Sequence, residues 1–469
     1  MRRLEAARRG LSVFCWSAAV VFVVVVQPLY LLPVEQQLPI VLALTLMGLF
    51  AAKPLRSTAG PDRVVGDFID LLLVVVAAAT GFYVADNYQA IIHRQGAFTP
   101  TDIQVSVVAV IIVLEAIRRS VGWPLTIVSL VFIAYAIFGR SMPGLLVHRG
   151  YSFSTTASHL LLTYAGIYGP PLKIMIRYVM IFMVFGSLLQ VVGASDVLVR
   201  FSQAIAGRFT GGLGKVAVIA SALVGTVSGS AAGNVATTGA VTIPAMKRAG
   251  YPAHVAGAIE SVASTGGQIM PPIMGAAAFL MAEYLGVPYG QVALAATLPA
   301  IIYFLSVGMA VDLYARAHGL RGMAPAQIEP LRQVLREGWL YILPIGVLFG
   351  LLILGYSATF AALVGVGLAL VLLVVKRAGL RQVLAALEEA GRGAATLCIV
   401  SAVAGIVVGV MQLTGLGARL ASVLVDLSAG SSLVLLVLTM VVSIILGMGM
   451  PTTVVYVLLV SLVVPALVQ

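Results

Sequence analysis

A segment inside an apolar stretch carries the side chains and backbone freedom that an ion site needs. Residues 228–239 read Ser-Gly-Ser-Ala-Ala-Gly-Asn-Val-Ala-Thr-Thr-Gly between two apolar runs. Unpaired backbone groups are costly in lipid, so such a stretch must lie inside protein or line a cavity. We expect a helical hairpin whose tip offers oxygens to a hard cation such as Na⁺. The residues predicted to bind ion or substrate at this tip are Ser228, Gly229, Ser230, Gly233 and Asn234.

The second helix of this hairpin would begin at the tip, where its free N–H groups carry a partial positive charge suited to a carboxylate. The alternative is close helix packing through small residues. Packing accounts for the glycines and alanines but not for Asn234 among so many hydroxyls.

A second interruption, residues 264–272, reads Ser-Thr-Gly-Gly-Gln-Ile-Met-Pro-Pro within the membrane-length segment 253–285. Its glycines and prolines predict an unwound middle that frees carbonyls for an ion. A kinked helix without a ligand is the alternative. The predicted binding residues are Ser264, Thr265, Gly266, Gly267, Gln268, Pro271 and Pro272. For Na⁺ itself, the two interruptions together predict a site at Ser228, Asn234, Ser264 and Thr265.

Glu260 lies one turn before the second interruption, within the apolar stretch. A carboxyl group at membrane depth is costly and is therefore a functional hypothesis by default. Two roles stay open for it: holding a cation, or pinning a helix through hydrogen bonds.

A third interruption, residues 447–453, resembles the first in its place within the chain. Segments 226–246 and 446–467 each pass from an apolar run through small and polar residues to an apolar run ending in Ile/Val-Pro-Ala. Repeated halves with broken helices are typical of secondary transporters, whose binding site lies between the halves. By this symmetry, the predicted binding residues are Gly447, Gly449, Pro451, Thr452 and Thr453.

Composition requires that lipid surrounds the elements carrying these residues. The 469 residues are 61% hydrophobic and only 10% charged, whereas a soluble protein carries about 25% charged residues. Because backbone groups must be satisfied within each span, we predict an all-α polytopic transmembrane bundle. The net charge of +11 comes from basic residues between spans, which favours an inner-membrane protein with a cytoplasmic N-terminus over nucleic-acid binding.

The chain divides by texture into residues 1–150 and 151–469. The first part has plain spans near 11–32, 37–52, 66–84, 104–117 and 121–139, in which Asp70 and Glu115 are interpreted as interfacial or packing groups. The second part has glycine- and proline-interrupted spans. Amphipathic pieces at 195–208 and 379–392 are expected to lie as separate helices at the membrane surface.

The sequence disfavours an enzyme. No HExxH, GxSxG or P-loop pattern occurs. An intramembrane enzyme would need a dyad, and Glu260 with His254 is the candidate pair. The two lie six residues apart, so on one continuous helix they point in roughly opposite directions.

Residues 229–251 and 257–286 resemble the large, DctM-like membrane subunit of TRAP (tripartite ATP-independent periplasmic) transporters, and the plain first part resembles their small subunit. The whole chain is similar to the fused, TAXI-associated permeases. The resemblance implies an elevator-type carrier with inverted repeats, re-entrant hairpins and a discontinuous helix. It also implies import of an organic anion, such as a C4-dicarboxylate, with Na⁺ as coupling ion and a periplasmic substrate-binding protein as partner.

The family would continue beyond Gln469 with a second discontinuous helix, so the resemblance predicts an incomplete second repeat. Two further functions therefore stay open beside the tripartite permease. One is an ion-coupled carboxylate carrier that works without a binding protein, and the other is a truncated remnant that does not transport.

Overall fold

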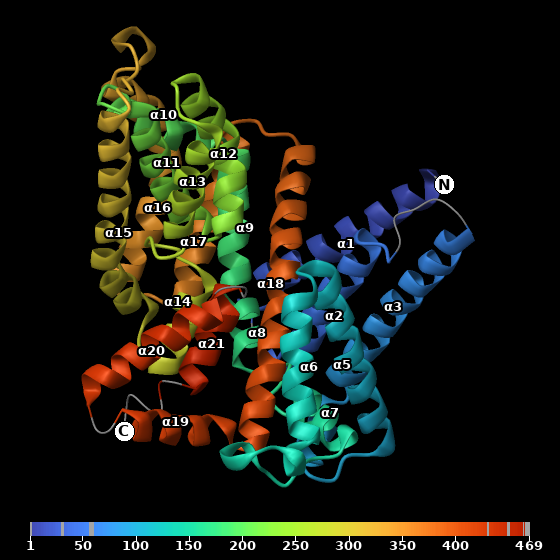
Figure 1. The fold of residues 1–469 in the computed structure, drawn as a ribbon. Helices are drawn as coiled ribbons and strands as arrows, with labels where there is room; N and C mark the ends of the chain where they lie inside the picture. The colour runs from blue at the N-terminus through green and yellow to red at the C-terminus, as the bar shows by residue number, and fades with distance from the viewer. Residues whose placement is uncertain are drawn as a thin grey trace. The chain divides into compact units, whose positions relative to one another are not determined.

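The computed structural model describes residues 2–29, 32–55, 61–428, 431–447, 451–462 and 464. Within these ranges every regular element is helical, and nine helices are long and apolar enough to cross a membrane. The predicted all-α polytopic bundle is therefore confirmed (Figure 1). Contacts divide the chain into two compact units, residues 1–180 with 391–469 and residues 181–390.

The first unit contains the plain spans predicted for the N-terminal part. Its helices are α1 (Arg2–Val26), α2 (Val34–Ala52), α3 (Pro61–Asp86), α4 (Tyr88–His93), α5 (Pro100–Ser120), α6 (Trp123–Ile137), α7 (Phe153–Leu162) and α8 (Pro170–Ile174), and, later in the chain, α19 (Leu416–Leu427), α20 (Ser432–Gly447) and α21 (Thr452–Leu462). Short 3₁₀ turns span Gly139–Ser141 and Gly144–Leu146, and a π-turn spans Met175–Val179.

Local sequence fixes the start of α5 in this unit. The hydroxyl of Thr99 accepts a hydrogen bond from the Asp102 N–H at 3.2 Å, and the Asp102 carboxyl group accepts one from the Thr99 N–H at 2.9 Å. This reciprocal capping satisfies two N–H groups that the first turn of a helix would otherwise leave unpaired.

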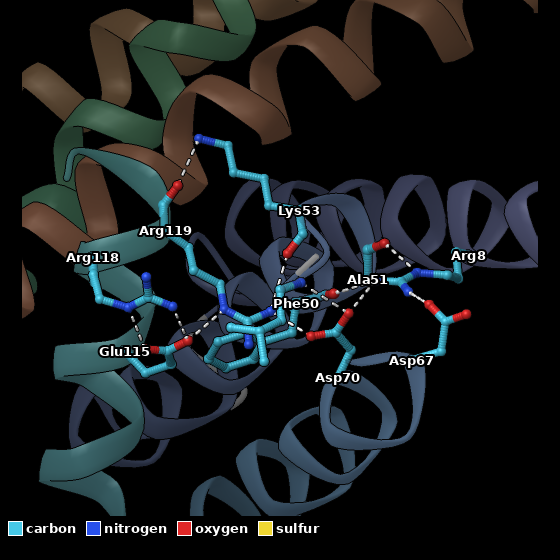
Figure 2. A network of polar contacts seen from close by, with 10 residues as sticks. Arg8, Phe50, Ala51, Lys53, Asp67, Asp70, Glu115, Arg118 and Arg119 are labelled. Carbon is cyan, nitrogen blue, oxygen red and sulfur yellow. Dashed lines mark hydrogen bonds and ion pairs between the residues drawn. The ribbon is translucent and has the colours of Figure 1, made fainter. Parts of the chain in front are cut away.

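A network of ion pairs joins α1, α3 and α5 in the same unit (Figure 2). Asp70 is buried between Arg8 Nη2 at 2.7 Å and Arg119 Nη1 at 2.5 Å. Arg119 Nε also donates to Glu115 at 2.7 Å, and its guanidinium lies 5.1 Å from the centre of the Phe50 ring. The structural interpretation of Asp70 and Glu115 is confirmed, because Asp70 ties α3 to α1 and α5, and Glu115 holds Arg119 from within α5.

The second unit begins at the start of α9 (Met180–Val191) and ends inside α18 (Leu380–Thr414). Between them lie α10 (Ala194–Ala206), α11 (Gly212–Ser228), α12 (Ala231–Arg248), α13 (Ala253–Gly266), α14 (Ala276–Leu285), α15 (Tyr289–Ala317), a 3₁₀ turn (Pro325–Gln327), α16 (Leu331–Ile353) and α17 (Ala358–Val375). The helices α11, α12 and α13 lie side by side (Figure 1). Their contact encloses a core that includes Val218, Met246, Tyr251 and Ala263.

Two sequence expectations meet different outcomes here. The amphipathic piece at 195–208 forms the separate helix α10. The piece at 379–392 does not end before the next span, because α18 runs unbroken over 35 residues. The glycines in this stretch lower helix propensity without stopping the helix. The predicted division into residues 1–150 and 151–469 was based on resemblance to two family subunits, whereas the two units described above are defined by contacts. The predicted division therefore stays a prediction.

Candidate ion and substrate site in the second unit

The predicted hairpin tip is a two-residue turn. The helix α11 ends at Ser228, and Gly229 follows with φ +60° and donates its N–H to the Gly225 carbonyl at 3.2 Å. Glycine adopts this left-handed conformation without strain. Ser230 then caps α12, because its hydroxyl accepts the Gly233 N–H at 3.2 Å. The hairpin is present, but residues 231–239 are helical and only Gly229 and Ser230 leave the helix.

The predicted unwound middle of the next helix is also present. The helix α13 ends at Gly266, α14 begins at Ala276, and residues 267–275 lie between them in turns. Pro271 and Pro272 have no N–H to continue a helix. The carbonyl of Pro272 accepts a hydrogen bond from the buried Tyr289 hydroxyl at 2.9 Å. The break therefore starts three residues later than the polar sequence at 264–272 indicates.

Glycines bring the hairpin and the break into direct backbone contact. A Cβ atom placed on Gly225 would lie 2.5 Å from the Cα of Gly267, and one placed on Gly229 would collide with the Met274 carbonyl. Neither position leaves room for a side chain. These glycines thus let the two backbone segments approach closely, as the alternative of close packing through small residues predicted. They place the break directly beside the hairpin turn.

Two buried oxygens at this junction have no hydrogen-bond partner among the described residues. They are the Oγ of Ser228 and the Oδ1 of Asn234. The amide nitrogen of Asn234 is held, because it donates to the Ser221 carbonyl at 2.8 Å. Buried polar atoms are nearly always satisfied by protein, water or an ion. Oxygen ligands of this kind suit a hard cation, so the chemistry of Ser228 and Asn234 fits the predicted Na⁺.

Glu260 lies at the centre of a cage of hydroxyl groups. Its Oε1 atom accepts hydrogen bonds from Ser221 and Ser264, both at 3.0 Å, and from Thr238. Its Oε2 atom accepts one from Thr242 at 2.5 Å. All five side chains are buried. No basic group of the described residues forms an ion pair with Glu260. Its carboxyl group is instead hydrogen-bonded by hydroxyl donors on α11, α12 and α13.

Of the two roles left open for Glu260, the structure displays helix pinning, because the carboxyl group joins three helices through hydrogen bonds. It also uses the hydroxyl of Ser264 that the sequence assigned to Na⁺. The hydroxyl of Thr265 donates to the Ser261 carbonyl at 2.8 Å, on an exposed part of the helix. The Na⁺ role of these two residues stays a prediction.

The remaining predicted residues of this unit lie at the same junction. Gly266 faces the Tyr303 ring so closely that a Cβ would collide with it, and the Gln268 carbonyl accepts the Gly275 N–H at 2.7 Å. The predicted residues of this unit lie on the hairpin, on α13 or in the break after it, and all but the exposed Thr265 lie near the junction; they are Ser228, Gly229, Ser230, Gly233, Asn234, Glu260, Ser264, Thr265, Gly266, Gly267, Gln268, Pro271 and Pro272.

The predicted third interruption belongs to the first compact unit. Gly447 ends α20, Pro451 precedes α21, Thr452 is exposed and Thr453 is buried. Gly449 lies outside the described residues. An interruption between two helices is therefore present, and its symmetric role in binding stays a prediction.

Sequence reasoning missed Ser221, Thr238 and Thr242 as site residues. Thr238 and Thr242 stand four residues apart and so share one face of α12, and this spacing was the available signal. Ser221 has no such signal, because only the packing of α11 brings it to Glu260. The enzyme dyad does not form: His254 is exposed and is not a partner of the buried Glu260.

Comparison with known proteins identifies the family of the chain. A family model described as "Tripartite ATP-independent periplasmic transporter, DctM component" matches residues 108–469. A Pseudomonas aeruginosa protein named C4-dicarboxylate TRAP transporter large permease protein DctM is 28% identical over 184 residues, which cover 39% of this chain and 43% of the relative.

Two further relatives carry names with other solutes. The sialic acid TRAP transporter permease protein SiaT of Haemophilus influenzae is 24% identical over 188 residues, 40% of this chain and 30% of the relative. The 2,3-diketo-L-gulonate TRAP transporter large permease protein YiaN of Escherichia coli is 31% identical over 91 residues, 19% of this chain and 21% of the relative.

The matched stretches span less than half the length of each of these three relatives. The family match is broader, because it covers more than half of the 469 residues. Members of this family are transport proteins rather than enzymes. The nine apolar helices among the described residues agree with a multi-pass membrane protein. The chain belongs to the family of TRAP transporter large permeases.

Proposed function

We propose that the chain is the permease of a secondary TRAP transporter that imports a small organic anion together with Na⁺. The observation that carries this proposal is the pair of unpartnered buried oxygens, Ser228 Oγ and Asn234 Oδ1, beside a hairpin turn and a broken helix. Broken helices in transporters supply carbonyls to cations and helix N-termini to anionic groups. Both features occur within α11–α14.

In the proposed cycle, Na⁺ binds at the oxygens of Ser228 and Asn234 and at carbonyls of the break that starts at Gly267. The bound cation and the N-terminus of α12 then offset the negative charge of a substrate carboxylate. The second unit carries both ligands as one elevator-type body. The close contact of Gly225 with Gly267 and the hydroxyl cage around Glu260 support this, since they hold the hairpin and the break together.

We propose a location in the bacterial inner membrane with the N-terminus in the cytoplasm. Basic residues support this orientation: Arg8 and Arg9 precede the apolar run of α1, which starts at Leu11, whereas Arg94 is the only Lys or Arg between Asp86 and Asp102. The names of the relatives support an organic anion as substrate, because they include a C4-dicarboxylate and sialic acid, both carboxylates. The partner would be a periplasmic substrate-binding protein, as the family description implies.

Uptake into proteoliposomes tests the proposal. The full chain would be given labelled succinate or sialic acid, with and without a Na⁺ gradient and with and without its cognate binding protein. Uptake that needs both Na⁺ and the binding protein is expected. Uptake with Na⁺ and no binding protein would instead identify a stand-alone carrier, and absence of uptake by folded protein would contradict transport of these solutes.

A matched pair of serine variants tests the Na⁺ site itself. Ser228→Ala removes an oxygen that has no hydrogen-bond partner among the described residues, so it breaks none of their hydrogen bonds. Ser306→Ala, in the same unit, removes an exposed hydroxyl that bonds to the Tyr303 carbonyl at 2.7 Å. We expect only Ser228→Ala to raise the Na⁺ concentration for half-maximal uptake, by about tenfold, which is roughly 1.4 kcal/mol. Equal Na⁺ dependence in the two variants would remove Ser228 from the site.

A further inference from the structure

The first turns of α16, in the second unit, carry two arginines beside an open groove. Arg332 and Arg336 lie four residues apart, so they share one face of the helix. Both side chains are exposed, and none of the described acidic groups forms an ion pair with either of them. The groove has a volume of about 900 Å³ and is lined by Pro330, Arg332, Gln333, Arg336 and Glu337. Both guanidinium groups are therefore available to an anion.

The acidic residue of this groove is already engaged by other side chains. Glu337 accepts hydrogen bonds from Arg200 of α10 at 2.7 Å and from Gln333 at 3.1 Å. Arg200 also binds Glu329, whose carboxyl oxygen lies 3.0 Å from the Nε atom. These contacts pair the two carboxylates with Arg200 and leave the positive charge of the two α16 arginines uncompensated.

The arginine pair projects from the side of α16 that faces away from α10. A Cβ atom placed on Gly338 would collide with Val197 of α10, so this side of α16 packs against α10. Arg336 stands two residues before Gly338, which is about 200° around the helix axis. Arg336 and Arg332 therefore lie nearly opposite the contact with α10.

An apolar surface continues from the arginines along the same face of α16. Trp339 follows Arg332 by seven residues and is 56% exposed, and Leu343 follows Arg336 by seven residues and is 43% exposed. Seven residues are close to two full turns, so each apolar side chain lies in line with one arginine. The segment Pro325–Ile353 is long and apolar enough to cross a membrane. The exposed apolar side chains of α16 would then contact lipid.

The order of these groups along α16 matches the order of groups in a phospholipid. A guanidinium binds phosphate through paired hydrogen bonds. Tryptophan favours the boundary between headgroups and hydrocarbon, and Trp339 lies about 10 Å along the helix from Arg332. Leu343 lies about 6 Å further, at the level of acyl chains. A free phosphate would contact only the arginines, whereas a phospholipid contacts all four side chains.

We propose that Arg332, Arg336 and Trp339 form a binding site for an anionic phospholipid such as phosphatidylglycerol, with its phosphate on the two arginines. A choline headgroup carries its own cation beside the phosphate, and the arginines repel that cation. The site is separate from the ion and substrate residues of α11–α14. A lipid bound there would fix the depth of α16 in the bilayer.

Quenching of tryptophan fluorescence by brominated lipids tests the proposal in bilayers. The chain has three tryptophans. Trp16 is buried, whereas Trp123 and Trp339 are 58% and 56% exposed. Trp123→Phe leaves Trp339 as the exposed reporter, and Trp339→Phe leaves Trp123. Trp123 is a matched control, because Arg118 lies 5.7 Å from its ring centre but is paired with Glu115 at 2.7 Å.

The full chain would be placed in phosphatidylcholine bilayers that contain brominated phosphatidylglycerol or, at the same mole fraction, brominated phosphatidylcholine. At Trp339 we expect an affinity about tenfold higher for phosphatidylglycerol. At Trp123 we expect the two lipids to quench equally. Equal quenching at Trp339 would refute the site and leave two arginines that only extend to water.

Variants in the Trp123→Phe background then assign the preference to the arginine pair. Replacing both residues, Arg332→Gln with Arg336→Gln, should abolish it, and these exposed side chains make no ion pair that folding requires. Arg208→Gln, which removes another exposed arginine of the unit, should leave the preference unchanged. A preference that survives the double substitution would overturn the assignment.

Inorganic phosphate distinguishes a lipid from a free anion at the same arginines. A large excess of phosphate, at constant ionic strength, should leave the preference at Trp339 intact, because the acyl chain also contributes to binding. Loss of the preference would assign the arginines to a free anion and overturn the lipid site. The assay needs no transport, so failed uptake with a retained lipid preference would contradict the proposed function and leave this inference standing.

Discussion

The hydroxyl cage around Glu260 allows hydrogen bonding and charge to be separated by two substitutions at one position. Glu260→Ala removes every acceptor in the cage. Thr238 and Thr242 keep an alternative, since their hydroxyls lie 2.8 and 3.0 Å from the carbonyls of Asn234 and Thr238. Ser221 can still donate to the Thr238 hydroxyl at 3.2 Å, whereas Ser264 keeps only a contact with Ser221 at 3.5 Å. One poorly satisfied buried hydroxyl costs about 1–3 kcal/mol. The cavity left by the removed side chain adds to this cost, so we expect a loss of about 2–5 kcal/mol.

Glu260→Gln keeps the acceptor oxygen that Ser221, Thr238 and Ser264 share. The new amide group can face Thr242, whose own proton can go to the Thr238 carbonyl at 3.0 Å. This variant therefore keeps its hydrogen bonds satisfied, and we expect its stability to stay within about 1 kcal/mol of the parent.

Thermal unfolding in detergent measures both variants. The alanine variant should unfold roughly 10 °C lower, by the scaling for a domain of this size, and the glutamine variant should unfold within a few degrees of the parent. Glu283→Ala, an exposed carboxyl group of α14, is the control and should change little. If the glutamine variant unfolded as early as the alanine variant, the hydrogen-bond argument would be refuted and the charge itself would be required.

Three further predictions follow from other contacts. Gly267→Ala must push the break away from Gly225, so Na⁺-stimulated uptake should be lost while expression persists; retained Na⁺ stimulation would contradict the close-contact argument. Arg119→Ala strips Asp70 of one of its two arginines and should destabilise the first unit by about 3 kcal/mol, whereas the more exposed Arg118→Ala should cost under about 1 kcal/mol in the same unfolding assay. Because burial lowers the pKa of His159 from its ordinary 6.5, the unfolded chain binds the proton first. Stability should thus be full above about pH 6.5 and fall below it, and His159→Gln should flatten that fall in unfolding measured against pH.

The hairpin and the broken helix were predictable because their signals are local. Gly229 at a left-handed position, Ser230 as a cap and the Pro271-Pro272 pair each act within a few residues. The extent of the hairpin tip was not predictable from composition. Small and polar residues occur both in turns and at the start of a tightly packed helix, so residues 231–239 gave the same signal in either state.

The cage was beyond sequence reasoning because its members come from three helices. Ser221 and Glu260 are 39 positions apart in the sequence, and the residues next to them in the sequence do not indicate that they are in contact. The orientation of Thr265 was not predicted for a related reason, since adjacent residues on a helix point in different directions. Ser264 turns toward the cage while Thr265 turns to the exposed face.

The cage has a consequence for how the helices of this unit are aligned lengthwise. Apolar helices can slide past one another at small cost because one methyl group replaces another. Thr238 and Thr242 instead donate to the two oxygens of a single carboxyl group. Both hydrogen bonds can therefore form at only one position of α12 along its own axis. A shift of one helical turn moves α12 by about 5.4 Å and leaves an oxygen facing a different side chain. The carboxyl group therefore acts as a register mark, as buried polar residues do in coiled coils.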